Sequence, residues 1–202
     1  MARRKGTLKT QAKPADKEDM EEVVLALPDT NAGLRDRVLL LLGFRGAFRR
    51  SELAGLDIED LTFIEAGITI RLRHSKTDKE GKGMYKAISE RKRNLQLCPV
   101  YNTNRYLEAL GRTTGPLFVG TSRGGNFLSN RISGMSIHRI LKKHLGNDYS
   151  PHSLRSGFVT AARKLDIPDY QIQNQTHHKD IRTLGEYYRP ESIWEDNAES
   201  KL

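Results

Sequence analysis

Residues 16–44 carry apolar side chains at the spacing of α-helices. Between Asp16 and Pro28 they stand at i, i+3, i+4 and i+7, which predicts one amphipathic helix that the proline ends. A second helix is predicted over residues 33–44. Its run 38–42 is apolar on every side, so we expect this helix in the middle of the core. The apolar residues of the first predicted helix are Met20, Val23, Val24 and Leu27.

Residues 58–90 follow a different pattern, made of short runs rich in β-forming apolar residues. Gly67 separates the first two runs, and the turn-forming stretch 78–83 separates the second from the third. We therefore predict a small antiparallel sheet of three strands. Its apolar positions are Ile58, Leu61 and Phe63, then Ile68, Ile70 and Leu72, and finally Met84, Tyr85 and Ile88.

The rest of the ordered chain is predicted to be helical. Ser51 is expected to cap a short helix over 52–56 by accepting a hydrogen bond from a backbone amide. Further helices are expected over residues 99–110, 136–145, 152–165, 170–175 and 180–188. The predicted fold class is α+β, mostly α-helical with one small three-stranded antiparallel sheet.

The composition indicates a globular protein and favours a nucleic acid as its partner. The chain has 202 residues, 37% hydrophobic and 29% charged, which fits one globular domain with a heavily charged surface. Its formal net charge of +9 favours a polyanionic partner, DNA or RNA. The longest apolar runs, 23–27 and 38–42, are too short to cross a bilayer. Cys98 is the single cysteine, which suits a reducing cytoplasm, where we expect the protein.

Two arginines and a histidine are candidates for binding a phosphate group. Arg49 stands just ahead of the short capped helix, where its guanidinium and nearby amides can meet a phosphate. The alternative is an ion pair with Glu52. His152 and Arg155 are three residues apart at a helix start, so they share a face and can point at one phosphate. For His152 the alternative is a purely structural histidine.

Other candidates lie in a predicted hairpin and near the end of the chain. Lys76 is in the hairpin turn, from which its ammonium can give a proton to a leaving oxygen; the alternative is a solvated lysine. His177, His178 and Asp180 suggest a metal site, but no second cluster of ligands at suitable spacing completes it. Tyr187, taken alone, is an ordinary core or surface residue.

Taken in order, six of these residues resemble the active-site positions of the tyrosine recombinases, the phage-integrase family. They are Arg49, Lys76, His152, Arg155, His178 and Tyr187. The surrounding sequence resembles the family's first arginine motif, its β-hairpin lysine motif, its His-x-x-Arg box and the histidine segment that leads to the nucleophile. In this chain these are residues 47–53, 75–81, 151–160 and 178–187. The resemblance covers about residues 15–190.

The chain departs from the family's motifs at three positions. The glycine often found two residues before the first arginine is Ala47, and the glycine usual just before the last histidine is His177. The second threonine after that histidine is replaced by Leu184. His177 leaves the choice between the two histidines open, and the spacing to Tyr187 favours His178.

The resemblance implies an enzyme that cuts and rejoins DNA on the tyrosine recombinase catalytic fold, without metal, ATP or another cofactor. Tyr187 is then the nucleophile that forms a 3′-phosphotyrosine, and His152 accepts its proton. Lys76 protonates the departing 5′ oxygen. The charge that grows on the phosphate is met by three donors: Arg49, Arg155 and His178.

The same resemblance implies a division of the chain and a set of partners. Residues 1–15 are expected to be a basic tail or linker, 16–190 the catalytic domain and 191–202 a C-terminal tail. The family's usual N-terminal core-binding domain is expected to be absent. The implied partner is double-stranded DNA, on which we expect a homo-oligomer, a tetramer. The chain is expected to be bacterial or phage-derived, monomeric in isolation and without affinity for membranes.

Three other functions compete with this interpretation. A type IB topoisomerase uses similar chemistry but only relaxes supercoils. The residues of the four motifs favour a recombinase. A DNA-binding regulator on the same scaffold would need no competent catalytic residues, whereas all six positions here are competent. A metal-dependent phosphoesterase would use His177, His178 and Asp180, and EDTA would stop it.

Overall fold

The computed structural model describes residues 13–73 and 83–177 of the chain. The helices are α1 (Lys17–Ala26), α2 (Asn31–Arg45), α3 (Arg50–Gly55), α4 (Pro99–Leu110), α5 (Gly134–Leu145), α6 (Pro151–Arg163) and α7 (Asp169–Thr176). The strands are β1 (Leu61–Ile64), β2 (Gly67–Leu72), β3 (Met84–Ser89), β4 (Val119–Thr121) and β5 (Phe127–Arg131). Two 3₁₀ turns, η1 (Ile58–Asp60) and η2 (Leu95–Leu97), lie between them.

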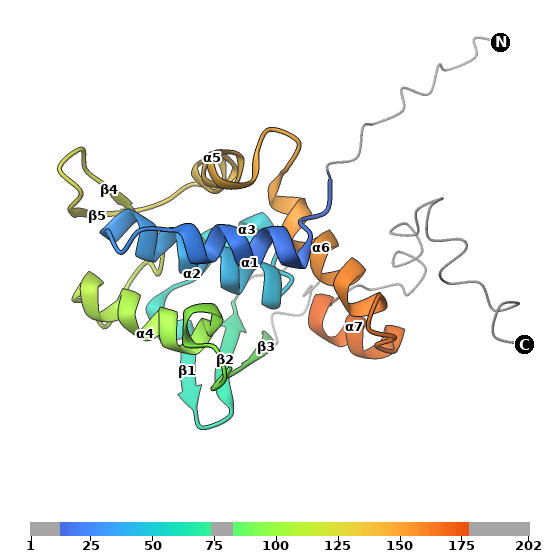
Figure 1. Ribbon diagram of the computed structural model, residues 1–202. Helices are drawn as coiled ribbons and strands as arrows, with labels where there is room; N and C mark the ends of the chain where they lie inside the picture. The colour runs from blue at the N-terminus through green and yellow to red at the C-terminus, as the bar shows by residue number, and fades with distance from the viewer. Residues whose placement is uncertain (1–12, 74–82, 178–202) are drawn as a thin grey trace, which may run out of the picture.

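Helix α2 is the centre of the core, as its apolar sequence predicts. Each residue of its run Val38–Leu42 is at most 1% exposed. Helices α1, α4 and α6 pack directly against it. Figure 1 shows α5 on one side of this layer, the three-stranded sheet beside α4 on the other, and α6 and α7 together at one end. Burial on every side therefore explains why the run 38–42 has no polar residue.

The predicted three-stranded antiparallel sheet is confirmed, in the order β1–β2–β3. On the core-facing side of β2, Ile68, Ile70 and Leu72 are each at most 2% exposed. One assignment was wrong: Ile58 belongs to η1 and not to a strand. The reason is local, because the Asp60 carboxylate accepts from the Asp57 backbone N–H at 2.9 Å and closes a turn there.

The structure adds elements that the sequence did not reveal. β4 and β5 form a two-stranded antiparallel sheet; β4 has only three residues and β5 is mostly exposed, so neither carries a clear apolar alternation. The predicted cap Ser51 was wrong. Arg49 is the N-cap of α3, and the Glu52 side chain accepts from its backbone N–H at 2.9 Å. The predicted helix 180–188 lies outside the described residues.

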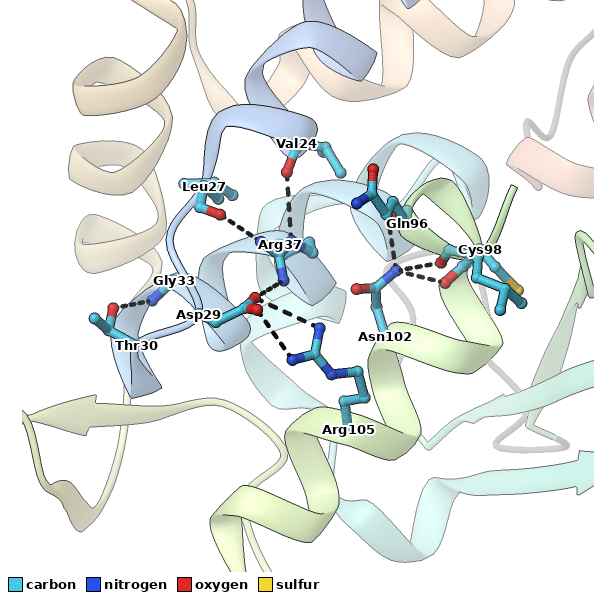
Figure 2. Close-up of polar contacts among 11 residues, drawn as sticks. Val24, Leu27, Asp29, Thr30, Gly33, Arg37, Gln96, Cys98, Asn102 and Arg105 are labelled. Atoms are coloured by element: carbon cyan, nitrogen blue, oxygen red, sulfur yellow. Dashed lines mark hydrogen bonds and ion pairs between the residues drawn. The ribbon is translucent and has the colours of Figure 1, made fainter. Parts of the chain in front are cut away.

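A polar cluster ties α1, α2 and α4 together (Figure 2). Arg37 donates to the Leu27 carbonyl at the end of α1 and to the Asp29 carboxylate at 2.8 Å. Asp29 also pairs with Arg105 of α4 at 3.2 Å. On the same helix, the Asn102 amide donates to backbone carbonyls of the preceding turn. The turns that enter α2 and α4 are therefore fixed relative to the core.

Helix α6 is held against the segment that precedes α1. The Ala15 backbone N–H donates to the Ser153 carbonyl at 2.9 Å. At Gly157, an added Cβ would lie 2.0 Å from the Ala15 carbonyl oxygen, so only glycine permits this approach. Ser150 caps the helix and Pro151 occupies its first turn, which sets where α6 begins.

None of the helices within residues 13–73 and 83–177 is long and apolar enough to cross a bilayer.

Candidate active site

Three of the six predicted site residues line one hollow, with a volume of about 320 Å³. Arg49 reaches it from the start of α3, and His152 and Arg155 reach it from the first turns of α6. Residues about one hundred positions apart in the sequence therefore share one site. Its remaining walls are Phe48, Arg50, His138, Ser150 and Pro151. The other predicted residues, Lys76, His178 and Tyr187, lie outside the described residues.

Arg49 is oriented by a buried carboxylate. Glu52, 4% exposed, accepts from the Arg49 backbone N–H at 2.9 Å and from Nη1 at 2.7 Å. Burial alone would raise the pKa of Glu52, but these hydrogen bonds and the positive charges of Arg49 and Lys86 hold it below its ordinary value. The ion pair considered as an alternative for Arg49 is therefore present, and it fixes the guanidinium at the edge of the hollow.

Arg155 is almost completely buried, at 2% exposure, and still contributes to the lining of the hollow. Its Nη1 donates to the Ala47 carbonyl at 2.8 Å, which links α6 to the turn before Arg49. His152, one turn earlier on α6, is exposed. The helix thus presents a fixed cation and an accessible imidazole from one face.

Left-handed backbone occurs at both positions where the motifs that this chain resembles carry glycine. Ala47 has φ 46° and His177, which ends α7, has φ 53°. Left-handed backbone suits glycine because it has no Cβ, and a residue with a side chain adopts it at a cost of about 1–2 kcal/mol. Ala47 and His177 therefore adopt a backbone conformation that glycine would adopt at lower cost.

This strain gives a testable difference in stability at His177. His177→Val is expected to unfold about 1–2 kcal/mol more easily than His177→Gly, because a β-branched side chain tolerates left-handed backbone worst. Urea unfolding of the two variants and the parent, followed by circular dichroism, measures the difference. Equal midpoints and slopes for the two variants would contradict it.

The sequence analysis missed Lys86, a lysine of β3 that is only 2% exposed. Burial lowers its pKa to about 7; the Glu52 carboxylate opposes this shift, and Arg155 and Arg49 add to it. The signal was available, because alternation along β3 puts Lys86 on the same face as Met84 and Ile88.

The same environment acts on His177. Burial lowers its pKa to about 4, the positive charges of Lys86, Arg155 and Arg49 contribute, and Glu52 opposes them. The imidazole is therefore neutral near pH 7. A metal site would suit a neutral imidazole, but within the ranges 13–73 and 83–177 no group of three His, Cys, Asp or Glu side chains is placed to hold a metal ion. His178 and Asp180, the other predicted ligands, lie outside these ranges.

Comparison with known families decides where this chain belongs. The model of the phage integrase family matches residues 15–192. The chain belongs to the phage integrase family. The match covers all four motifs that carry the predicted site residues.

Similar members of the phage integrase family are named recombinases. An integrase/recombinase XerD homologue of Selenomonas ruminantium is 36% identical over 177 residues, 85% of this chain and 52% of that protein. The tyrosine recombinase XerC of Syntrophus aciditrophicus is 31% identical over 173 residues, 81% of this chain and 51% of that protein. The chain therefore spans about half the length of the curated relatives it matches.

Solved structures confirm the predicted fold. The XerA recombinase superimposes with a TM-score of 0.67 at 19% identity, over 94% of this chain and 66% of that one. XerH bound to its palindromic difH substrate, in a post-cleavage complex, gives a TM-score of 0.60 at 17% identity, over 92% of this chain and 54% of that one. The mostly helical domain with a small antiparallel sheet is the catalytic fold of tyrosine recombinases.

Proposed function

We propose that this chain is the catalytic domain of a site-specific DNA recombinase, which cleaves and rejoins DNA through a 3′-phosphotyrosine without metal or ATP. The observation that carries the proposal is the shared hollow of Arg49, His152 and Arg155. Two guanidinium groups and an exposed imidazole at one site suit a phosphodiester whose charge grows during displacement. The family match over residues 15–192 supports assigning 16–190 to the catalytic domain.

In this mechanism, negative charge develops on the non-bridging phosphate oxygens as the nucleophile attacks. Arg49 and Arg155 donate to those oxygens, and His178 adds a hydrogen bond; together they supply the charge that Mg²⁺ supplies in other phosphoryl transfers. Glu52 prepares Arg49 for this role because its carboxylate fixes the guanidinium before substrate arrives.

The proton transfers fall to three other residues. The Tyr187 oxygen attacks phosphorus and forms the phosphotyrosine bond while the bond to the 5′ oxygen breaks. His152 takes the phenol proton, and its exposure on α6 suits a group that must meet both substrate and nucleophile. Lys76 gives a proton to the departing 5′ oxygen. Attack by a 5′ hydroxyl of another strand reverses these steps, so no external energy source is needed.

Duplex DNA is the proposed partner. XerH, which shares the fold, is described bound to difH DNA in both pre-cleavage and post-cleavage complexes. A lambda integrase dimer, with a TM-score of 0.53, is described bound to a COC′ core site. The net charge of +9 on this chain is consistent with binding DNA backbone phosphates. We extend the proposal to a homo-oligomer, a tetramer, assembled on DNA from monomers.

A nicked suicide substrate tests the proposed function. The chain is incubated with this DNA at low salt, with EDTA, and the products are separated under denaturing conditions. A covalent protein–DNA adduct that forms equally with and without EDTA is expected, because the reaction uses no metal. Tight binding without cleavage would favour the regulator, and cleavage that leaves no adduct and stops in EDTA would favour a metal-dependent phosphoesterase. Relaxation of supercoils without strand exchange between sites would favour the topoisomerase.

A further inference from the structure

Lys86 occupies a position where β-sheet geometry calls for an apolar residue. It pairs with Ile70 in the β2–β3 register and lies on the core-facing side of β3, together with Ile88. Lysine is rarely fully buried, because its charge loses the stabilisation by water unless protein groups replace it. The contacts of this side chain should therefore show what it does.

The Lys86 ammonium joins β3 to the end of α7. Nζ donates a hydrogen bond to the Gln175 carbonyl and lies 5.2 Å from the centroid of the Phe48 ring. The Gln175 side chain completes the connection, because its Nε2 donates to the Ala87 carbonyl of β3 at 3.2 Å and to the Arg45 carbonyl of α2 at 2.9 Å. The last turn of α7 is thus attached to both the sheet and the central helix.

We propose that Lys86 is a positioning residue of the cleavage site, which holds the C-terminal turn of α7 against β3 and against the turn that carries Phe48 and Arg49. This proposal rests on the proposed function for its effect on cleavage. Lys86 is not expected to touch DNA, because its ammonium is buried against the Gln175 carbonyl and the Phe48 ring.

The position of Lys86 along the chain explains why this attachment affects the chemistry. β3 follows directly on the segment that contains Lys76, and α7 ends at Thr176, two residues before His178. Lys86 therefore anchors the described ends of the two segments that carry Lys76 and His178, two residues of the proposed mechanism. Arg49 supports the same turn, because its Nη2 donates to the His177 carbonyl at 3.4 Å.

Charge and backbone conformation both indicate why a lysine is needed there. A carbonyl at the C-terminal end of a helix lacks the N–H partner of a following turn and carries partial negative charge, and at Gln175 the Lys86 side chain supplies the donor. His177 extends that turn in left-handed backbone, which lasts only if its neighbours hold it. A valine or methionine would fill the same space but would leave the Gln175 carbonyl without the Lys86 donor.

The first test uses hydrogen exchange and needs no activity. In Lys86→Met, the amides of Thr176 and His177 are expected to exchange about tenfold faster than in the parent, while those of α2 stay equally protected. Lys92→Met is the matched control, since Lys92 follows the same strand but has a side chain 76% exposed. Unchanged exchange at the end of α7 in Lys86→Met would overturn the proposal, whether or not the chain cleaves DNA. If Lys86→Met also loses protection in α2, the same experiment is done with Lys86→Gln. Exchange should again be faster at Thr176 and His177 and unchanged in α2.

The second test separates binding from chemistry on the nicked suicide substrate. Lys86→Met is expected to lower the single-turnover cleavage rate about 10–100-fold, since a displacement of about 1 Å in a catalytic group can cost two orders of magnitude. The Kd for DNA should change less than about threefold. Lys86→Arg, which keeps a cationic donor, should restore most of the rate. Equal rates in the parent and Lys86→Met would overturn the effect on cleavage, whereas a parent that forms no adduct would overturn the proposed function and leave the exchange result standing.

Discussion

Arg155→Lys is expected to lower the rate of adduct formation by about 10²–10³-fold, the cost of losing a preorganised donor to a developing oxyanion. Arg155 has two tasks in this structure. Its Nη1 donates to the Ala47 carbonyl at 2.8 Å, and its guanidinium also lines the hollow. A guanidinium is a rigid fork that can serve both partners, whereas an ammonium is a single point of charge on a flexible stem. A lysine at this position can therefore not donate with good geometry to both the Ala47 carbonyl and the phosphate.

The measurement is single-turnover cleavage of the nicked substrate at saturating protein, with the Kd for DNA measured separately. DNA affinity is expected to fall less than about threefold, because backbone contacts from many basic residues dominate it. Arg123→Lys is the matched control, since Arg123 is exposed in the turn between β4 and β5. A parent-like rate for Arg155→Lys would show that charge alone suffices and that the fork has no role.

Burial explains which parts of the fold could be predicted from the sequence. The run Val38–Leu42 is apolar on every side, and a helix with that property has one stable place, in the core. The three-stranded sheet was predicted from alternation that burial of one face imposes. β4 and β5 were not predicted because β4 is too short to show such alternation and the middle of β5 is exposed.

The site residues could be predicted where residue type and spacing already indicate the chemistry. They could not be predicted where contacts distant in the sequence determine the position of the side chain. The spacing of His152 and Arg155 on α6 gave a shared face, and the structure places Arg49 at the same hollow. The cap of α3 could not be predicted from propensity, because Arg49 occupies it only through the reciprocal contact with Glu52. Lys86 was overlooked because a lysine in a strand is usually exposed, although its alternation with Met84 and Ile88 indicated the buried face.

The two positions where the family's motifs usually carry glycine are held by contacts with the site arginines. At Ala47 and His177 the backbone is left-handed, and each carbonyl is engaged by a site arginine: Ala47 by Arg155, and His177 by Arg49. Strain at functional sites lasts when surrounding contacts over-determine the conformation. The arginines that we assign to phosphate binding therefore also hold the turns from which the motif's other residues extend.

Tyr187→Phe is expected to abolish the covalent adduct, a loss of at least about 10⁴-fold, since removal of a nucleophile leaves no atom to form the phosphotyrosine bond. Tyr187 lies outside the described residues, so the assignment rests on its place nine residues after His178 and within the family match over 15–192. The variant should still bind DNA with parent-like affinity, because the phenol hydroxyl is a small part of the contact with DNA.

Tyr188→Phe is the control that makes the test specific, because it removes the same hydroxyl from the neighbouring position. It should keep the adduct, and digestion of the parent adduct followed by mass spectrometry should place the nucleotide on Tyr187. If Tyr188→Phe loses the adduct and Tyr187→Phe keeps it, the spacing argument is wrong. His177 would then need to be reconsidered as the catalytic histidine, since the choice of His178 depends on the same spacing. Loss of the adduct in both variants would require the mass spectrum to assign the nucleophile, because either hydroxyl could then contribute to the reaction.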